Sequence, residues 1–502
     1  MVSDPIYGYV YFNREVEEQV INSIVVQRLR YIMQLQTAHL VYPGAVHTRF
    51  QHSLGVMHLT GLVAEDFTEK LVFFYGESIL EGFKPAVIVE ASRLAGLLHD
   101  IGHAAFGHSF EHSILWRRDP PSDLSNHEKI GLKLFKVLLE DKLESMESKL
   151  DLPGLTELTV KLLGDKGEQH PVIEAFKWIL RDGLYPSDVM DFLRRDSYYA
   201  GTSEYGYVSY ERLYRNTYPI IENKSFKAVL DRTGIGEFKQ YMIAKASMYE
   251  HVYYHSVCRA FDRILDILLE KLDEEYGFYE RVAAISRGEL EGFLELTDVY
   301  VYSLMLSKAL REDSEVGRLA RLMLIERKPL WRRVGGDYVL SGYKGPVLTG
   351  EILRLILDRS WRSRVETALL EELKKKLKGF NIDESSLWID ILDLSPVPRT
   401  LLYPNGGGVP RVVLYTGKVS RRQVVVDREL NLLEGESPLA VIIRAYVARD
   451  KYTIELEPVV SKTVKETLES MLGINAEEYR RAVEEAYKST RSIDHSRFKM
   501  TM

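Results

Sequence analysis

The chain has 502 residues, of which 45% are hydrophobic and 28% charged, and its formal net charge is −7 at pH 7. These values are typical of an ordinary globular protein and exclude a disordered or fibrous chain. The acidic balance argues against a protein whose main role is to coat nucleic acid or an anionic membrane. The length is sufficient for about two or three domains.

A single cysteine, Cys258, excludes a disulfide framework within the chain and any zinc or iron–sulfur site built from several cysteines. A bound metal would therefore have His and carboxylate ligands. The first residues lack the basic and apolar regions of a signal peptide, and no apolar run reaches the ~20 residues needed to span a bilayer. We expect a cytoplasmic protein without a membrane segment, and its low Asn and Gln content favours a heat-adapted source.

Residues 13–310 have mainly helical patterning. In residues 85–100, Pro85 suits a first helical turn, and Ile88, Ala91, Ala95 and Leu98 form one apolar face. Residues 239–272 contain no Pro or Gly, which predicts a second long helix.

The pattern changes after about residue 325. Gly335 and Gly336 separate shorter segments, and β-branched stretches predict strands at 411–415, 423–426 and 440–447. Residues 461–472 and 476–487 return to a helical pattern. We therefore predict a mainly α fold, with a helical domain over 1–325, a mixed connecting region over 326–400 and a smaller α+β region over 401–502.

The histidines are clustered, with nine of the 13 lying between positions 39 and 127. His99 and Asp100 are adjacent near the end of a predicted helix and cannot both enter an apolar core unpaired, because unpaired buried polar groups cost several kcal/mol. A divalent ion would satisfy both, and imidazole with carboxylate suits Mn, Fe, Ni, Zn or Mg. His52 and Asp188 are the natural residues to complete such a site.

Two sets of residues recur at four-residue spacing. Asp188 and Asp196 share one helix face, and 8 residues at about 1.5 Å each separate their carboxylates by roughly 12 Å. One carboxylate can then hold a metal while the other reaches the far end of a substrate. Lys245, Tyr249 and Tyr253 have the same spacing and offer a cation for phosphate and two rings for a sugar or base.

The order of His52, His99 with Asp100, and Asp188 resembles the signature of the HD-domain phosphohydrolases. Their flanking segments are similar to the branch that contains the deoxynucleoside triphosphate triphosphohydrolases; these segments are residues 27–35, 42–45, 49–56, 248–249 and 252–255. The resemblance covers roughly residues 4–270. It implies a helical core and one divalent metal ion bound by His52, His99, Asp100 and Asp188.

The same resemblance implies roles for further residues. It implies phosphate contacts by Arg49 and His108, with Lys245 where the family usually has Arg. The catalytic histidines would be His103 and His127, supported by Glu111. The residues around the deoxyribose would be Gln34, Asp196 and Tyr253, whereas Phe192 replaces a Tyr and Val189 replaces a phosphate-binding Lys of the triphosphohydrolases.

The resulting hypothesis is a metal-dependent hydrolase that splits dNTPs into deoxynucleoside and triphosphate, through water attack on the α-phosphorus. The alternatives are an HD-type nucleotidase, phosphodiesterase or nuclease, or a nucleotide-binding or single-strand-binding module with an idle site. The resemblance implies a homo-oligomer, dimeric or larger, and nucleic acid stays open as a partner without being favoured. We expect solvent or core positions for the other histidines of the cluster, which are His39, His47, His58 and His112.

Overall fold

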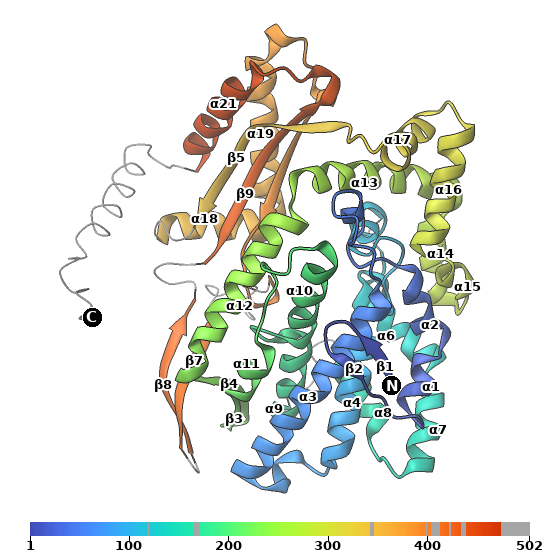
Figure 1. Cartoon of the computed structure of the whole chain (residues 1–502), viewed down its shortest axis with the longest axis vertical. Helices are drawn as coiled ribbons and strands as arrows, with labels where there is room; N and C mark the ends of the chain where they lie inside the picture. Colours follow the sequence, from blue (N-terminus) through green and yellow to red (C-terminus); the bar gives the residue numbers. More distant parts are fainter. Residues whose placement is uncertain are drawn as a thin grey trace, which may run out of the picture. The chain divides into compact units, whose positions relative to one another are not determined.

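The computed structural model describes residues 1–118, 120–164, 170–341, 346–397, 399–402, 412–420, 423–432 and 438–472 (Figure 1). The chain divides into two compact units, Met1–Leu330 with Val413–Asn431 and Trp331–Val412 with Leu432–Met502. The division at 330 lies close to the boundary predicted at 325, and residues 413–431 join the first unit. The predicted subdivision into 326–400 and 401–502 stays a prediction. The helix predicted at 476–487 lies outside the described residues.

The first unit is mainly helical. Its α-helices are α1 (Glu17–Ile21), α2 (Ile24–Gln27), α3 (Arg49–Tyr75), α4 (Pro85–Leu98), α5 (His108–Phe110), α6 (His127–Leu138), α7 (Glu140–Leu150), α8 (Leu155–Leu163), α9 (Pro171–Lys177), α10 (Ser187–Ala200), α11 (Tyr210–Arg215), α12 (Ile235–Met248), α13 (Ser256–Tyr276), α14 (Phe278–Ala283), α15 (Glu291–Leu294), α16 (Asp298–Arg311) and α17 (Glu315–Leu324). Its short 3₁₀ segments include η1 (Arg28–Tyr31), η2 (Ala38–Leu40), η3 (Glu77–Leu80), η5 (Ser122–Leu124), η7 (Arg232–Gly234) and η9 (Ala284–Arg287). Three segments are π-helical: η4 (Glu111–Leu115), η6 (Trp178–Asp182) and η8 (Tyr249–Tyr253).

The centre of this unit is the long helix α3, which packs against α4 and α10 (Figure 1). It begins with a capping box, in which the side chains of Thr48 and Gln51 each bond the other's backbone. Helix α4 begins at Pro85, which suits a first helical position, and ends at Leu98, so that the helix predicted at 85–100 is confirmed to within two residues. Apolar residues of α3 and α4 form much of the core, among them Val56, Leu59, Val63, Leu94 and Leu97.

The second predicted long helix is interrupted. Residues 239–272 form α12, the π-helical segment η8 and α13, and the helical run stops at Tyr254 and His255. His255 has extended backbone angles (φ −55°, ψ 128°) and caps the start of α13. The expectation of one continuous helix is therefore wrong, because the absence of Pro and Gly does not prevent a π-helical segment from shifting the backbone hydrogen bonds.

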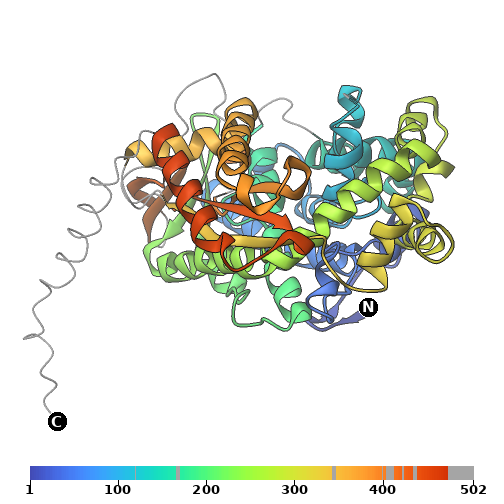
Figure 2. The ribbon, with the colours of Figure 1, turned by 90° about the horizontal axis from the view of Figure 1, so that it is seen from above.

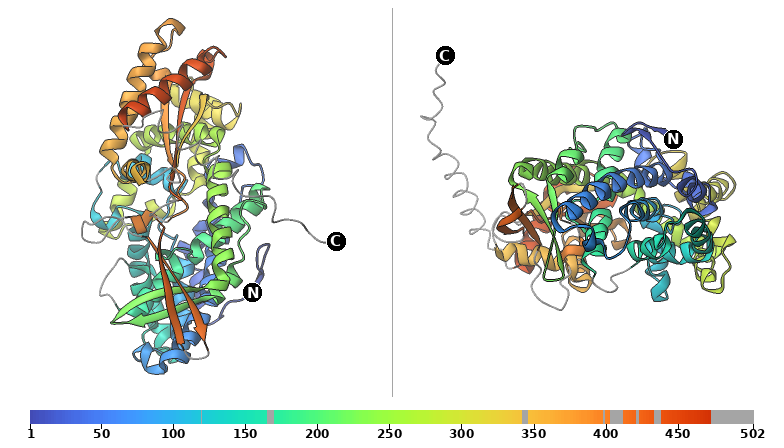
Figure 3. Two further views of the ribbon diagram at one scale, coloured as in Figure 1. Left: turned by 90° about the vertical axis from the view of Figure 1, so that its left-hand side faces the viewer. Right: turned by 90° about the horizontal axis from the view of Figure 1, so that it is seen from below.

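Two sheets belong to the first unit. The N-terminal hairpin pairs β1 (Val2–Asp4) with β2 (Gly8–Val10). The second sheet has the order β3-β4-β7-β8 and is formed by β3 (Thr217–Glu222), β4 (Ser225–Asp231), β7 (Val413–Ser420) and β8 (Gln423–Asn431) (Figure 3). Strands β4 and β7 run parallel, with Val229 opposite Tyr415. A hairpin from late in the sequence thus completes a sheet begun almost 200 residues earlier, a pairing that strand patterns alone do not predict.

The second unit is an α+β structure. Its antiparallel sheet has the order β5-β9-β6 and is formed by β5 (Trp331–Ser341), β9 (Ala440–Ala448) and β6 (Leu387–Asp393). Its helices are α18 (Pro346–Leu357), α19 (Arg359–Lys376), α20 (Arg399–Leu402) and α21 (Leu456–Met471), with η11 (Lys378–Phe380), η12 (Glu384–Ser386) and η13 (Arg449–Lys451) between elements. Helices α19 and α21 pack on each other and on the sheet (Figure 2).

Gly335 and Gly336 lie inside β5 and do not end a strand. Both have positive φ and form a bulge between Val334 and Asp337, where the register with β9 shifts. The mainly α fold with a smaller α+β region is confirmed. Among the described residues, we find no helix that combines the length and the apolar character needed to cross a membrane.

Arg28 connects three segments of the first unit. Its buried guanidinium donates hydrogen bonds to the carbonyl groups of Ile101 (3.2 Å) and His103 (2.7 Å), and also to those of Phe293 (3.5 Å), Leu294 (3.4 Å) and Leu296 (2.9 Å). Because these carbonyl groups belong to the segment that follows α4 and to the chain around α15, Arg28 holds both segments against η1.

We expect Arg28→Met to lower the free energy of unfolding by at least about 3 kcal/mol, because several buried carbonyl groups lose their donor. Urea unfolding followed by circular dichroism measures the change. The matched control is Arg30→Met, which removes an exposed arginine from the same η1 segment. Equal stability of the two variants would contradict this role of Arg28.

Candidate metal centre

Three elements bring the predicted metal ligands together. His52 lies in the first turn of α3, His99 and Asp100 directly follow α4, and Asp188 lies in the first turn of α10. His52 Nε2 is 3.0 Å from Asp188 Oδ1 and 3.9 Å from Asp100 Oδ2. His99 Nε2 is 3.3 Å from Asp100 Oδ1 and 3.6 Å from Asp188 Oδ1. The packing of α3 on α4 and α10 therefore gathers two imidazole nitrogens and two carboxylates around one point.

The hydrogen bonds of both histidine rings are suited to metal binding. His52 Nδ1 is 2.8 Å from Asp191 Oδ2, and His99 Nδ1 is 2.8 Å from the carbonyl oxygen of Gly96. When Nδ1–H donates to these oxygens, each Nε2 presents its lone pair to the shared point. His99 Nε2 is buried without a hydrogen-bond partner, so an electron-pair acceptor is missing there. His52, His99 and Asp100 form a compact donor group that could hold one divalent ion, and Asp188 lies beside both imidazoles.

The carboxylates of the centre are ionised at neutral pH. Burial raises the pKa of Asp100, but the charges of His99, Arg49 and His103 outweigh it and hold that pKa well below its usual value. Burial lowers the pKa of His52, yet hydrogen bonds to Asp188 and Asp191 raise it to about 10. His52 in the metal-free chain thus carries a proton that a bound cation would displace. The Asp188 side chain keeps 29% of its surface exposed, which leaves the centre open on that side.

Beside this centre lies a second group, formed by His103, His108, Glu111 and His127. His103 Nε2 is 3.4 Å from Asp100 Oδ1, and its ring stacks on that of His127 with centroids 3.8 Å apart. Glu111 Oε1 accepts from the backbone N–H of His127 and lies 2.7 Å from His127 Nδ1, while Oε2 is 3.1 Å from His108 Nδ1. Glu111, at the start of η4, therefore orients two of the three rings.

The two stacked histidines have opposite pKa shifts. Burial and the nearby charges of Arg49 and His127 lower the pKa of His103 well below its usual value. Burial also lowers the pKa of His127, but the charge and hydrogen bond of Glu111 outweigh this and raise it. Burial raises the pKa of Glu111, but the charges and hydrogen bonds of His127 and His108 outweigh this and hold it well below the usual value. His103 is therefore neutral at neutral pH, whereas His127 holds a proton more readily than an ordinary histidine does.

Arg49 and Lys245, the predicted phosphate contacts, are both 4% exposed. Arg49 Nη1 donates to Asp100 Oδ2 at 2.7 Å, so this cation lies directly beside the metal ligands. Gly107 has φ +52°, and a Cβ at this position would lie only 2.4 Å from Arg49 Nη2. Glycine at 107 is therefore required both by the backbone and by the close approach of the arginine. Lys245 lies in the last turn of α12.

The residues predicted around the sugar meet at Asp196. Tyr253 donates its hydroxyl hydrogen to Asp196 Oδ2 at 2.8 Å, and His47 Nε2 lies 2.8 Å from Asp196 Oδ1. The backbone N–H of Gln34 donates to the carbonyl oxygen of His47 at 3.0 Å, and Gln34 Oε1 is buried without a hydrogen-bond partner. Tyr249 contacts Tyr253 edge to face, with ring centroids 5.0 Å apart.

Sequence reasoning missed several of these partners. His47 was expected at a solvent or core position; it is buried, and it also bonds Asp196. Asp191, Arg195 and Asp4 were not singled out, although Asp191 and Arg195 have the i, i+4 spacing of a helical ion pair. That spacing was the available signal, but it does not reveal that Asp191 also bonds His52.

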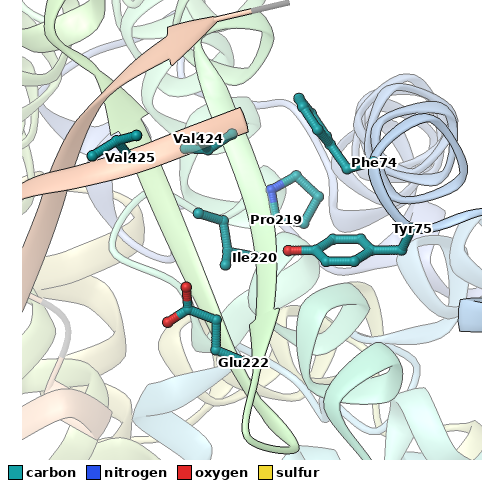
Figure 4. A pocket seen from close by; sticks show the side chains of 7 residues that line it. All are labelled: Phe74, Tyr75, Pro219, Ile220, Glu222, Val424 and Val425. Carbon is teal, nitrogen blue, oxygen red and sulfur yellow. The ribbon is translucent and has the colours of Figure 1, made fainter. Parts of the chain in front are cut away.

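A hollow of about 300 Å³ lies elsewhere in the first unit (Figure 4). It is lined by residues at the end of α3 and on β3 and β8, namely Phe74, Tyr75, Pro219, Ile220, Glu222, Val424 and Val425. None of the candidate metal ligands or histidines lines it. Its lining residues include one carboxylate and no cation for a phosphate, so the buried polar cluster is the better candidate site.

Comparison with known proteins identifies an HD domain and similar chains. Residues 49–166 match the model of the HD domain. Mouse deoxynucleoside triphosphate triphosphohydrolase SAMHD1 is 26% identical over 452 residues, which cover 84% of this chain and 66% of that protein. The uncharacterized protein YwfO of Bacillus subtilis is 29% identical over 279 residues, covering 55% of this chain and 57% of that protein. The chain spans slightly more than half to about two thirds of the length of such curated relatives.

Solved structures share the fold. A hypothetical protein from Aquifex aeolicus has a TM-score of 0.59 at 24% identity and covers 92% of this chain and 99% of its own. A phosphohydrolase from Bacteroides thetaiotaomicron has a TM-score of 0.60 at 20% identity and covers 89% of this chain and 99% of its own. The match to the HD-domain model over residues 49–166 agrees with the HD-domain resemblance predicted from the sequence motifs.

We expect Asp100→Ala to abolish binding of the divalent ion while the chain stays folded, because α3 and α4 retain their apolar contacts. Metal content after loading with Mn²⁺ and desalting, measured by mass spectrometry, tests this. Asp123→Ala is the control, since Asp123 pairs with Lys133 and keeps 53% of its side chain exposed. Full metal content in Asp100→Ala would contradict the proposed centre.

The pair of His127 and Glu111 generates a pH prediction. Because the folded pKa of His127 lies above its usual value of about 6.5, this interaction reaches its full strength as pH falls to about 6.5 and is lost as pH rises through the raised pKa. On the acid side, it is lost as pH falls through the lowered pKa of Glu111.

In Glu111→Gln, His127 loses the largest of the interactions that oppose burial, so we expect its pKa to fall below that in the wild type. Titration of the histidine side chains by NMR measures this shift. His39, whose pKa is lowered by burial and which does not contact Glu111, serves as the internal control and should titrate as in the wild type. An unchanged pKa of His127 would show that Glu111 is not its partner in solution.

Proposed function

We propose that this protein is a metal-dependent phosphohydrolase that hydrolyses dNTPs to deoxynucleoside and triphosphate. The observation that carries the proposal is the convergence of His52, His99, Asp100 and Asp188, with Arg49 and a histidine group directly beside them. The similarity to proteins named deoxynucleoside triphosphate triphosphohydrolase supports the choice of substrate.

In this proposal, the metal ion and the cationic side chains beside it have different roles. A divalent ion at this site would lower the pKa of water and polarise a phosphoryl oxygen. The side chains of Arg49 and Lys245 would neutralise charge on the phosphates, and His108 would contact them from its exposed position. Water would attack the α-phosphorus, so that the bond to the 5′-oxygen breaks and triphosphate leaves intact.

A proton must reach the departing 5′-oxygen, and His103 and His127 are the candidates. The raised pKa of His127 favours it, because a proton donor must be protonated at the working pH. Glu111 holds the His127 ring and its charge. His103 stacks on His127 and lies beside Asp100. As a neutral ring, it can hydrogen-bond there without adding charge to the site.

The group around Asp196 supports a nucleoside at the other end of the site. Asp188 and Asp196 lie two helical turns apart on α10, roughly 12 Å, a span suited to a phosphate at one end and a sugar at the other. Asp196, Tyr253 and Gln34 offer an acceptor, a hydroxyl and an amide to the deoxyribose and its 3′-hydroxyl. Tyr249 and the Phe192 ring, 6.1 Å from that of Tyr253, would supply apolar surface.

Phe192 and Val189 are the reason to test shorter phosphate esters as a second class of substrate. Each replaces a polar residue of the triphosphohydrolases, so a hydroxyl near the sugar and a cation near the phosphates are missing. Shorter phosphate esters, such as nucleoside monophosphates, depend less on these contacts.

Assembly and location complete the proposal. By similarity to the family, we propose a cytoplasmic homo-oligomer, a dimer or larger. Light scattering of the purified full chain, coupled to size-exclusion chromatography, measures the oligomeric state, and a monomer at all concentrations would contradict this part.

Incubation of the purified chain with Mn²⁺ or Mg²⁺ and a panel of dNTPs, NTPs and monophosphates tests the activity. We expect deoxynucleoside and free triphosphate in equal amounts by anion-exchange chromatography. The control Glu222→Gln alters a carboxylate of the distant hollow and should leave turnover unchanged, whereas Asp100→Ala should abolish it. Release of only orthophosphate or pyrophosphate would assign the protein to another reaction.

A further inference from the structure

The first strand of the N-terminal hairpin ends at a buried carboxylate, Asp4. Asp4 is 7% exposed, and its Oδ1 accepts the backbone N–H groups of Ile6 (2.9 Å) and Tyr7 (3.1 Å). Its Oδ2 accepts from Arg195 Nη1 at 2.8 Å. One oxygen thus holds the turn between β1 and β2, while the other bonds a residue of α10.

Arg195 continues this connection toward the metal centre. Its side chain is fully buried, and Nε and Nη2 donate to the two oxygens of Asp191, each at 2.9 Å. Asp191 is also fully buried, and its Oδ2 accepts from His52 Nδ1 at 2.8 Å. The chain of contacts runs without interruption from Asp4 through Arg195 and Asp191 to His52, whose Nε2 faces the other metal ligands.

Helix α3 makes room for this chain of contacts. A Cβ at Gly55 would lie 2.0 Å from Asp191 Oδ1 and 2.3 Å from Arg195 Nη2. No other residue type can occupy position 55 without displacing the ion pair. The ion pair and the glycine are therefore matched to each other within the core.

The contribution of Asp4 follows from the charges of Arg195 and its two carboxylate partners. Arg195 is shared between two carboxylates, so it neutralises neither completely. Without Asp4, the guanidinium would lose one anchor and its charge would act on Asp191 alone, which weakens Asp191 as an acceptor for His52. Partners behind a ligating histidine fix its tautomer and raise its basicity, and their loss typically costs 10–100-fold in metal affinity.

We propose that Asp4 and Arg195 are positioning residues of the metal centre, which orient the His52 ring through Asp191. The N-terminal hairpin then belongs functionally to the metal site, although no residue of the hairpin is a ligand. The inference rests on the metal-binding part of the proposed function and is independent of the substrate.

Titration of the metal-free full chain with Mn²⁺, with free Mn²⁺ followed by electron paramagnetic resonance, tests it. We expect Asp4→Asn to raise the dissociation constant about 10-fold or more. Arg195→Lys keeps the charge but cannot reach both carboxylates at once, so we expect a similar loss. Addition of hydrolysable substrate is not needed for this readout.

Glu17→Gln is the matched control. Glu17 is likewise a buried carboxylate of the N-terminal region, 1% exposed, and it pairs with Arg93 at 2.5 Å and caps the N–H of Asn13. It does not contact Arg195, Asp191 or His52 among the contacts of the described residues. We expect it to lower the melting temperature of the metal-free protein as Asp4→Asn does, but to leave the dissociation constant for Mn²⁺ unchanged.

The outcomes distinguish failure of the metal centre from failure of the positioning role of Asp4 and Arg195. A wild-type chain that binds no Mn²⁺ overturns the metal centre, and the positioning role with it. Wild-type binding together with unchanged affinity in Asp4→Asn overturns the positioning role alone, as does an equal loss in Glu17→Gln. If circular dichroism shows that Asp4→Asn does not fold, Arg195→Lys decides by the same comparison.

Discussion

Buried charge is the constraint on which the first unit depends. Carboxylates and cations removed from water must be paired, because an isolated buried ion costs many kcal/mol. The chain pairs Asp100 with Arg49, and Arg195 with both Asp191 and Asp4. The polar groups of the candidate metal centre meet at one point, where two imidazole nitrogens face two carboxylates. A divalent cation at this point would complete the balance, and the helices α3, α4 and α10 converge on it.

Two of the three π-helical segments found among the described residues carry residues of the candidate site. Glu111 is the first residue of η4, and Tyr249 and Tyr253 are the first and last residues of η8. A π-helical turn accommodates an extra residue and rotates the following side chains relative to a regular helix. Regular helices would direct these side chains differently, so the irregular turns are part of how the chain builds the site.

Backbone strain also occurs beside this site and is compensated there. Phe106 has φ +58° and Gly107 has φ +52°, directly after the segment that carries His103. The N–H of Phe106 donates to Asp298 Oδ1 at 2.6 Å, and Met33 donates to the other oxygen of that carboxylate at 2.9 Å. A buried carboxylate from α16 thus stabilises a conformation that a bulky residue otherwise avoids. The sharp turn that results brings Gly107 onto Arg49.

The sequence by itself determined the helical character, the smaller α+β region and the residues to consider as metal ligands, because these follow from periodicity, adjacency and motif order. It did not reveal that α12 and α13 are separated at Tyr254, or that β7 pairs with β4, since local patterns carry no information on distant partners. Only the tertiary structure decided that Asp4 reaches His52 through two buried residues. That connection needs Gly55 opposite the ion pair, and such a close approach depends on how two helices pack, which no spacing along the chain encodes.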